Sequence, residues 1–166
     1  MYETAIDILI TAGFEHYEVS NFAKPGKRCR HNETYWANEA YFGFGVGAAR
    51  YIDGNRELNV RNTNDYIKRV LSGESPTFQR ERLEPRDRAF ETIGTQLRRR
   101  GGIDRTQFET QTGFSLDSLV DVRIRSLVSH GLVIDEGDTV RLSHRGLCVA
   151  DGVIVDLMKA NYARGD

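Results

Sequence analysis

The sequence predicts an α/β protein with two domains, residues 1–80 and 81–166. In the first domain, apolar residues at helical spacing alternate with strand-like segments rich in aromatic and β-branched residues. In the second domain, three helical patterns precede a β-hairpin pattern and a last helix, which is a winged-helix-like layout. A polar stretch over residues 74–83, which contains Pro76, separates the two patterns.

The first domain opens with a helical pattern. Apolar residues recur over residues 5–12, and Gly13 is placed to end the helix. Residues 16–19 favour a short strand. The following residues, 20–38, include Pro25 and many polar side chains, so we expect a long loop there. Loops of that length in compact domains are usually functional or mobile.

A hairpin and a helix are expected in the rest of the first domain. The aromatic, glycine-rich stretch 40–52 and the alternating stretch 57–61 flank an Asp-Gly pair, which is a strong hairpin signal. Asn62 or one of its two successors can cap a helix that Gly73 ends.

The second domain carries clear helix boundaries. The expected first residues or caps of its four helices are Pro85, Asp104, Ser115 and Ser143. Residues 132–142 form a hairpin pattern with its turn at 136–138. On the last helix, Cys148 lies between two apolar residues and is expected to be buried.

Composition narrows the classes of function. With 39% hydrophobic and 28% charged residues and a net charge of −1, the chain reads as a soluble globular protein without bulk attraction to nucleic acid. No apolar run approaches the roughly 20 residues of a membrane span. The two cysteines, Cys29 and Cys148, are far apart in the sequence. They suit a reducing compartment, so we expect a cytoplasmic protein.

Three motifs follow one another between residues 17 and 48. Residues 17–26 read Tyr-Glu-Val-Ser-Asn-Phe-Ala-Lys-Pro-Gly, residues 29–36 contain Cys-Arg-His-Asn and Tyr-Trp, and residues 43–48 read Gly-Phe-Gly-Val-Gly-Ala. They resemble the YExSNFAxPG, CRHNxxYW and GxGxGA signatures of the HemW branch of the radical-SAM, oxygen-independent coproporphyrinogen III oxidase-like family (HemN/HemW). Residues 97–104 and 142–147 resemble its C-terminal domain more loosely.

The resemblance implies a fold and a chemistry. It implies the distal part of a partial (β/α) radical-SAM barrel followed by the C-terminal domain, so that the chain is a fragment of a heme chaperone. Family members bind a 4Fe–4S cluster on three closely spaced cysteines, with S-adenosylmethionine on the open iron. Because such a cluster needs three protein thiolates and the sequence has two cysteines, we expect no cluster and no radical chemistry here.

The resemblance points to heme binding around residues 29–36. The candidate heme-binding residues are Cys29, His31, Tyr35 and Trp36. An imidazole nitrogen suits the axial position of heme iron, and aromatic rings offer flat faces to the macrocycle. The structural alternative is that His31 hydrogen-bonds the loop while Trp36 fills the core. The basic residues of the segment 24–30 either bind the heme propionates or belong to a solvated loop; they are Lys24, Lys27, Arg28 and Arg30.

Two further groups are candidates through the resemblance. The first group is expected near S-adenosylmethionine and consists of Gly43, Gly45, Val46 and Gly47. We expect these residues on a strand, where glycines without side chains let a ligand come close to the backbone. The alternative is a glycine-rich strand at a bend. Glu18 and Asn21, at a strand end, are expected at the ligand mouth of the barrel. Asn21 equally suits the start of a turn.

Three functions remain open at the level of sequence. The first is a heme chaperone that handles heme or porphyrin and delivers it to a heme-acceptor protein. The second is a fragment of an oxygen-independent coproporphyrinogen III oxidase. The third is a winged-helix module that binds nucleic acid or protein, but acidic residues at 135, 136 and 138 oppose phosphate binding. We expect no nucleic-acid partner, and self-association through exposed barrel edges.

Overall fold

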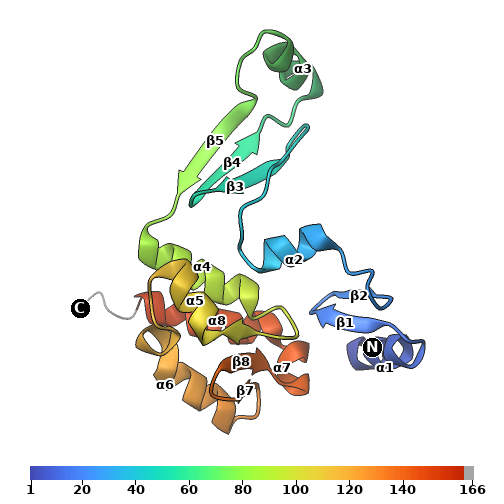
Figure 1. The fold of residues 1–166 in the computed structure, drawn as a ribbon, viewed down its shortest axis with the longest axis vertical. Coiled ribbons are helices and arrows are strands. Elements are labelled where there is room, and N and C mark those ends of the chain that lie inside the picture. Colours follow the sequence, from blue (N-terminus) through green and yellow to red (C-terminus); the bar gives the residue numbers. More distant parts are fainter. Residues whose placement is uncertain (163–166) are drawn as a thin grey trace. The chain divides into compact units, whose positions relative to one another are not determined.

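The computed structural model describes residues 1–162, which form two compact units (Figure 1). One unit combines residues 1–38 with the chain from Pro85 onward, and the other consists of Glu39–Glu84. The division expected between residues 80 and 81 falls inside a strand, β5 (Thr77–Arg82). Because β5 pairs with its neighbour β4 along its length, the second unit continues to Glu84.

The first 38 residues form four short elements. They are α1 (Tyr2–Thr11), β1 (Glu15–Glu18), β2 (Asn21–Ala23) and α2 (Arg30–Trp36). Strands β1 and β2 are antiparallel. The expectation of an unbroken loop over residues 20–38 is therefore wrong, because it contains β2 and α2. A seven-residue helix is unstable alone, and tertiary contacts rather than a periodic pattern hold it.

The chain from Pro85 onward supplies the main core. Its elements are α4 (Pro85–Gln96), β6 (Ile103–Asp104), α5 (Arg105–Thr112), α6 (Leu116–Ser129), β7 (Val133–Asp135), β8 (Thr139–Leu142), α7 (His144–Cys148) and α8 (Ala150–Tyr162). The strands form a sheet in the order β6-β8-β7. Large apolar side chains fill the centre, among them Phe90, Ile93, Leu97 and Phe108, all without exposed surface. Their burial is the main stabilising contribution.

Local chemistry fixes the ends of these helices. The Asp104 side chain accepts a hydrogen bond from the Gln107 amide, as expected of an N-cap, and Gly113 ends α5 in the left-handed conformation. The expected last helix is instead two helices, because the backbone leaves the helical region at Val149. Cys148 is exposed, so the expectation of a buried thiol is wrong.

The N-terminal segment joins this core through strand-like backbone contacts. The Val19 amide donates to the Arg98 carbonyl at 2.9 Å, and the Arg100 amide donates to the Tyr17 carbonyl at 3.0 Å. The Val19 side chain is buried within the main core. As a result, β1 pairs with the turn after α4 through an antiparallel bridge, in which Glu18 lies opposite Arg99.

The second unit is a three-stranded antiparallel sheet with one helix. Strands β3 (Ala49–Ile52), β4 (Asn55–Asn59) and β5 lie in that order, and α3 (Thr63–Leu71) connects the last two. The expected hairpin is present, with positive φ at both turn residues, Asp53 and Gly54. Asn62 caps α3 by accepting from the Asp65 amide. The polar stretch after α3 is a strand rather than a linker.

Arg105 clamps the β7–β8 hairpin, and its loss should destabilise the first unit. Both Nη atoms donate to Asp135 at 2.8 Å, and Nη2 donates to Asp117 at 3.1 Å. The hydrogen bonds from Arg105 lower the pKa of Asp135. We expect Arg105→Met to lower the free energy of unfolding by about 1–2 kcal/mol near neutral pH. Urea denaturation measures it.

The pH dependence of this effect follows from the sign of the pKa shift. Since the folded-state pKa of Asp135 lies below its unfolded value, the stabilisation is present above the unfolded pKa and is lost as pH falls through the folded pKa. The gap between wild type and Arg105→Met should therefore close in acid. Arg125→Met is the control, because Arg125 is 70% exposed and pairs with Asp121 one turn away. Equal losses in both variants would contradict the clamp.

Candidate functional site

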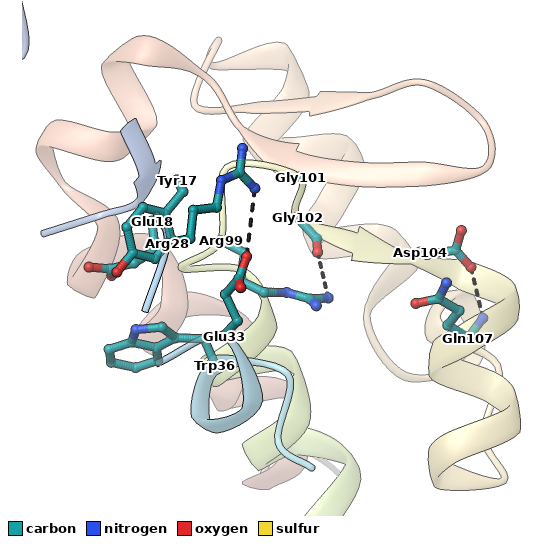
Figure 2. Close-up of a pocket in the computed structure, with 10 residues that line it drawn as sticks. All are labelled: Tyr17, Glu18, Arg28, Glu33, Trp36, Arg99, Gly101, Gly102, Asp104 and Gln107. Carbon is teal, nitrogen blue, oxygen red and sulfur yellow. Dashed lines mark hydrogen bonds and ion pairs between the residues drawn. The ribbon is translucent and has the colours of Figure 1, made fainter. Parts of the chain in front are cut away.

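A cleft of about 290 Å³ lies in the first unit, where β1, α2 and the residues after α4 meet (Figure 2). β1 contributes Tyr17 and Glu18 to its lining, and α2 contributes Glu33 and Trp36. The rest of the lining comes from Arg99, the two glycines that follow it closely, Asp104 at the end of β6 and Gln107 in α5. Three of the residues singled out from the sequence, Glu18, Arg28 and Trp36, are thus brought to one cleft.

Glu18 is a buried carboxylate with one oxygen satisfied and one not. Its side chain has no exposed surface. Oε1 accepts from the Ser20 amide at 3.0 Å and from the Asn21 side-chain amide, which closes the β1–β2 turn. Oε2 has no hydrogen-bond partner among residues 1–162. The side chains of Glu18 and Asn21 are therefore hydrogen-bonded to each other, and this bond stabilises the turn.

Of the two arginines that line the cleft, Arg28 pairs with carboxylates and Arg99 with a backbone carbonyl. Arg28 donates to Glu15 at 2.9 Å and lies 3.7 Å from Glu33, the ion pair drawn in Figure 2. Arg99 donates to the Gly102 carbonyl at 3.0 Å, also drawn there. Because Glu18, Glu33 and Asp104 also line the cleft, its lining carries charges of both signs and has little net attraction for a free anion.

Helix α2 presents a different face to solvent. Cys29 is its N-cap and is exposed, as are His31 and Tyr35. His31 and Tyr35 are four residues apart, so they lie on one face of the helix. Trp36 is half-buried, with the Arg98 guanidinium 5.1 Å from its ring centre, and contacts Tyr35 edge to face. The four heme candidates are therefore close together, with three on the surface.

A buried polar cluster holds the C-terminal end of α2. Gln111 Nε2 donates to the carbonyls of Ala37 and Asn38, at 3.1 and 2.8 Å. Gln96 Nε2 donates to the same Ala37 carbonyl at 3.0 Å, and Asn38 Nδ2 donates to Thr92 Oγ1 at 2.9 Å. Sequence reasoning missed this cluster. The available signal was Gln96, an amide three residues after Ile93 on the apolar face of α4.

The glycine motif belongs to the second unit and is a turn rather than a strand. Gly45 and Gly47 have positive φ values of 104° and 66°. The Tyr66 hydroxyl accepts from the Gly45 amide at 3.1 Å, and Asn59 Nδ2 donates to the Gly45 carbonyl at 3.0 Å. A Cβ at Gly43 would stand 2.0 Å from the Ala49 carbonyl oxygen. The glycines are therefore needed for this local backbone, and Val46 is part of the same turn.

Comparison with known proteins shows which proteins the chain resembles. The model of the HemN C-terminal domain matches residues 83–149. The heme chaperone HemW of Bacillus subtilis is 35% identical over 153 residues, which cover 92% of this chain and 40% of that protein. This chain is HemW-like. The mitochondrial radical S-adenosyl methionine domain-containing protein 1 of Bos taurus is 31% identical over 169 residues, 95% of this chain and 38% of that protein.

A solved structure shows the same fold. The coproporphyrinogen III oxidase HemN of Escherichia coli, described as a radical SAM enzyme, superposes with a TM-score of 0.69 over 93% of the HemW-like chain and 39% of its own length. At 15% identity, this likeness concerns the mixed α/β fold alone. The HemW-like chain thus spans about two fifths of the length of the proteins it matches.

The iron–sulfur cluster of radical-SAM proteins does not fit the residues present. Such a cluster needs three thiolates, and the HemW-like sequence has only Cys29 and Cys148. Across residues 1–162, no three His, Cys, Asp or Glu side chains are grouped as metal ligands. Within the same residues, every helix is too short or too polar to cross a membrane.

Proposed function

We propose that this chain is part of a heme chaperone and that the exposed face of α2 binds heme, with His31 as an axial ligand of the iron. Its similarity to proteins named heme chaperone HemW carries the proposal. The geometry supports it, because an exposed imidazole and an exposed aromatic ring share one face of α2. Heme is the cargo in this proposal, and a heme-acceptor protein receives it in the cytoplasm.

The finer description of the fold belongs to the same proposal. Residues 1–80 correspond to the distal portion of a partial radical-SAM barrel, and residues 81–166 correspond to a winged-helix-like HemN C-terminal domain. The order of α4, α5, α6 and the β7–β8 hairpin supports the second assignment. In this arrangement Glu18 and Asn21 lie at the barrel mouth, and Gly43, Gly45, Val46 and Gly47 lie near S-adenosylmethionine, which binds with the cluster in the whole protein.

Charge pairing in the first unit supports a role without nucleic acid. On α6, Arg123 pairs with Asp156 and Arg125 pairs with Asp121. Arg105, beside the hairpin, is held by Asp117 and Asp135. Cations that are already paired within the protein contribute little to phosphate binding.

The exposed edge of β5 is the place where the second unit could pair with a second chain, as we expect of an exposed barrel edge. Residues 80–82 on that strand read Arg-Glu-Arg, and charged edges disfavour such pairing. Light scattering across a concentration series measures the mass of the chain in solution. A monomer at every concentration would exclude the edge as an interface.

Titration with hemin tests the proposed function. The sequence has one tryptophan, Trp36, so a heme bound on α2 should quench its fluorescence while a Soret band develops. His31→Ala should weaken binding by at least about tenfold and alter the Soret band, because the axial nitrogen is lost. Cys29→Ala tests the thiol, and His130→Ala is a control on an exposed histidine of the same unit. No saturable binding to wild type would refute the proposal for this chain.

A further inference from the structure

The segment 24–30, which leads into α2 and includes its first residue, contains four cations, and the structure divides them into two pairs. No acidic residue occurs between residues 19 and 32. Lys24 Nζ donates to the Ala12 carbonyl at 2.9 Å and lies 4.2 Å from the centre of the Phe14 ring. Arg28 is bound to Glu15 and Glu33. These two cations are occupied in holding the β1–β2 hairpin and α2 in place.

Lys27 and Arg30 form the second pair. Both are exposed, and within residues 1–162 neither side chain forms an ion pair or hydrogen bond. Arg30 directly precedes His31, and Lys27 precedes it by four residues. The nearest acid along the chain is Glu33, which is 3.7 Å from Arg28. Two cations without ion pairs are therefore close in sequence to His31, the proposed iron ligand.

We propose that Lys27 and Arg30 bind the two propionate carboxylates of the heme whose iron His31 ligates. The inference rests on the proposed function. A single axial bond leaves the macrocycle free to rotate about it, and the propionates extend from one edge of the ring. Two cations beside the ligand select one orientation, since guanidinium and ammonium groups form charge-assisted hydrogen bonds with carboxylates.

The exposure of both cations has a consequence for affinity. Ion pairs at the protein surface are individually weak and are screened by salt. Heme that is held by one axial bond and two exposed ion pairs therefore binds with modest affinity and can be passed to another protein. The pair also gives selectivity for porphyrins that carry adjacent carboxylates over esterified ones.

The test compares hemin with hemin dimethyl ester, whose propionates cannot ionise, in the same mixed solvent. The variant is Lys27→Gln/Arg30→Gln. The control is Lys68→Gln/Arg82→Gln, which removes the same charge from exposed positions in the second unit. We expect the test variant to bind hemin roughly tenfold more weakly than wild type and the ester with unchanged affinity. The control should match wild type with both ligands.

The outcomes separate this inference from the proposed function. If wild type and the test variant bind hemin equally and His31→Ala still weakens binding, the propionate contacts are refuted while the heme site stands. If the test variant loses hemin and the ester alike, the cations do not act on the propionates and the inference fails. If wild type binds neither ligand, both proposals fall. Two results together support the inference. The test variant loses affinity for hemin but not for the ester, and added salt weakens the binding of hemin to wild type.

Discussion

Gly102→Ala is expected to lower the free energy of unfolding of the first unit by about 3–5 kcal/mol. Gly102 has a φ of 68°, a conformation that alanine adopts only with strain. An added Cβ would also stand 2.2 Å from the Val140 carbonyl oxygen and 2.7 Å from the Arg141 Cα. Both contacts are with the backbone of β8, so relief requires separating β6 from β8.

The neighbouring residue provides the control for this prediction. A Cβ added at Gly101 would meet no atom within 4 Å, and the φ of this residue is not positive. Gly101→Ala should therefore leave the stability within about 0.5 kcal/mol of wild type. Urea denaturation followed by circular dichroism compares the two variants. Equal stability of Gly101→Ala and Gly102→Ala would show that β8 adjusts to the added methyl group.

Gln111→Leu is expected to release α2 before the rest of the first unit unfolds. The change removes the donor to the Ala37 and Asn38 carbonyls. The Ala37 carbonyl keeps its hydrogen bond from Gln96, so the Asn38 carbonyl is the one left without this donor, at a cost of about 1–3 kcal/mol. Trp36, on α2, reports the release through its fluorescence, whereas circular dichroism follows the larger helices. In wild type the two urea transitions should coincide, and in the variant the fluorescence transition should come first.

Gln107→Leu is the matched control for the cluster. Gln107 is on the same helix, one turn earlier, and is exposed. Its side chain forms no hydrogen bond with other residues in the described chain. The same chemical change there should leave both transitions together. Early fluorescence change in both variants would mean that leucine on α5, rather than the lost donor, disturbs α2.

The sequence predicted those elements that depend on local chemistry. The caps at Asn62 and Asp104 and the Asp53-Gly54 turn follow from the residue types at those positions. By contrast, β5 has a polar sequence and exists because it pairs with β4, and α2 exists because the polar cluster holds its end. The same limit applies at the site. The motifs placed residues 29–36 together, but only the fold separates paired cations such as Arg28 from unpaired ones such as Lys27.

The first unit has a consequence for the order of events during synthesis. Its β1 strand is made before the backbone that pairs with it, because Arg98 and Arg100 follow about eighty residues later, after the whole second unit. At typical elongation rates of about 5–20 residues per second, that interval lasts several seconds. During it the Val19 side chain has no core to enter. The segment around Val19 therefore stays without its packing partners until α4 and the residues after it have been made.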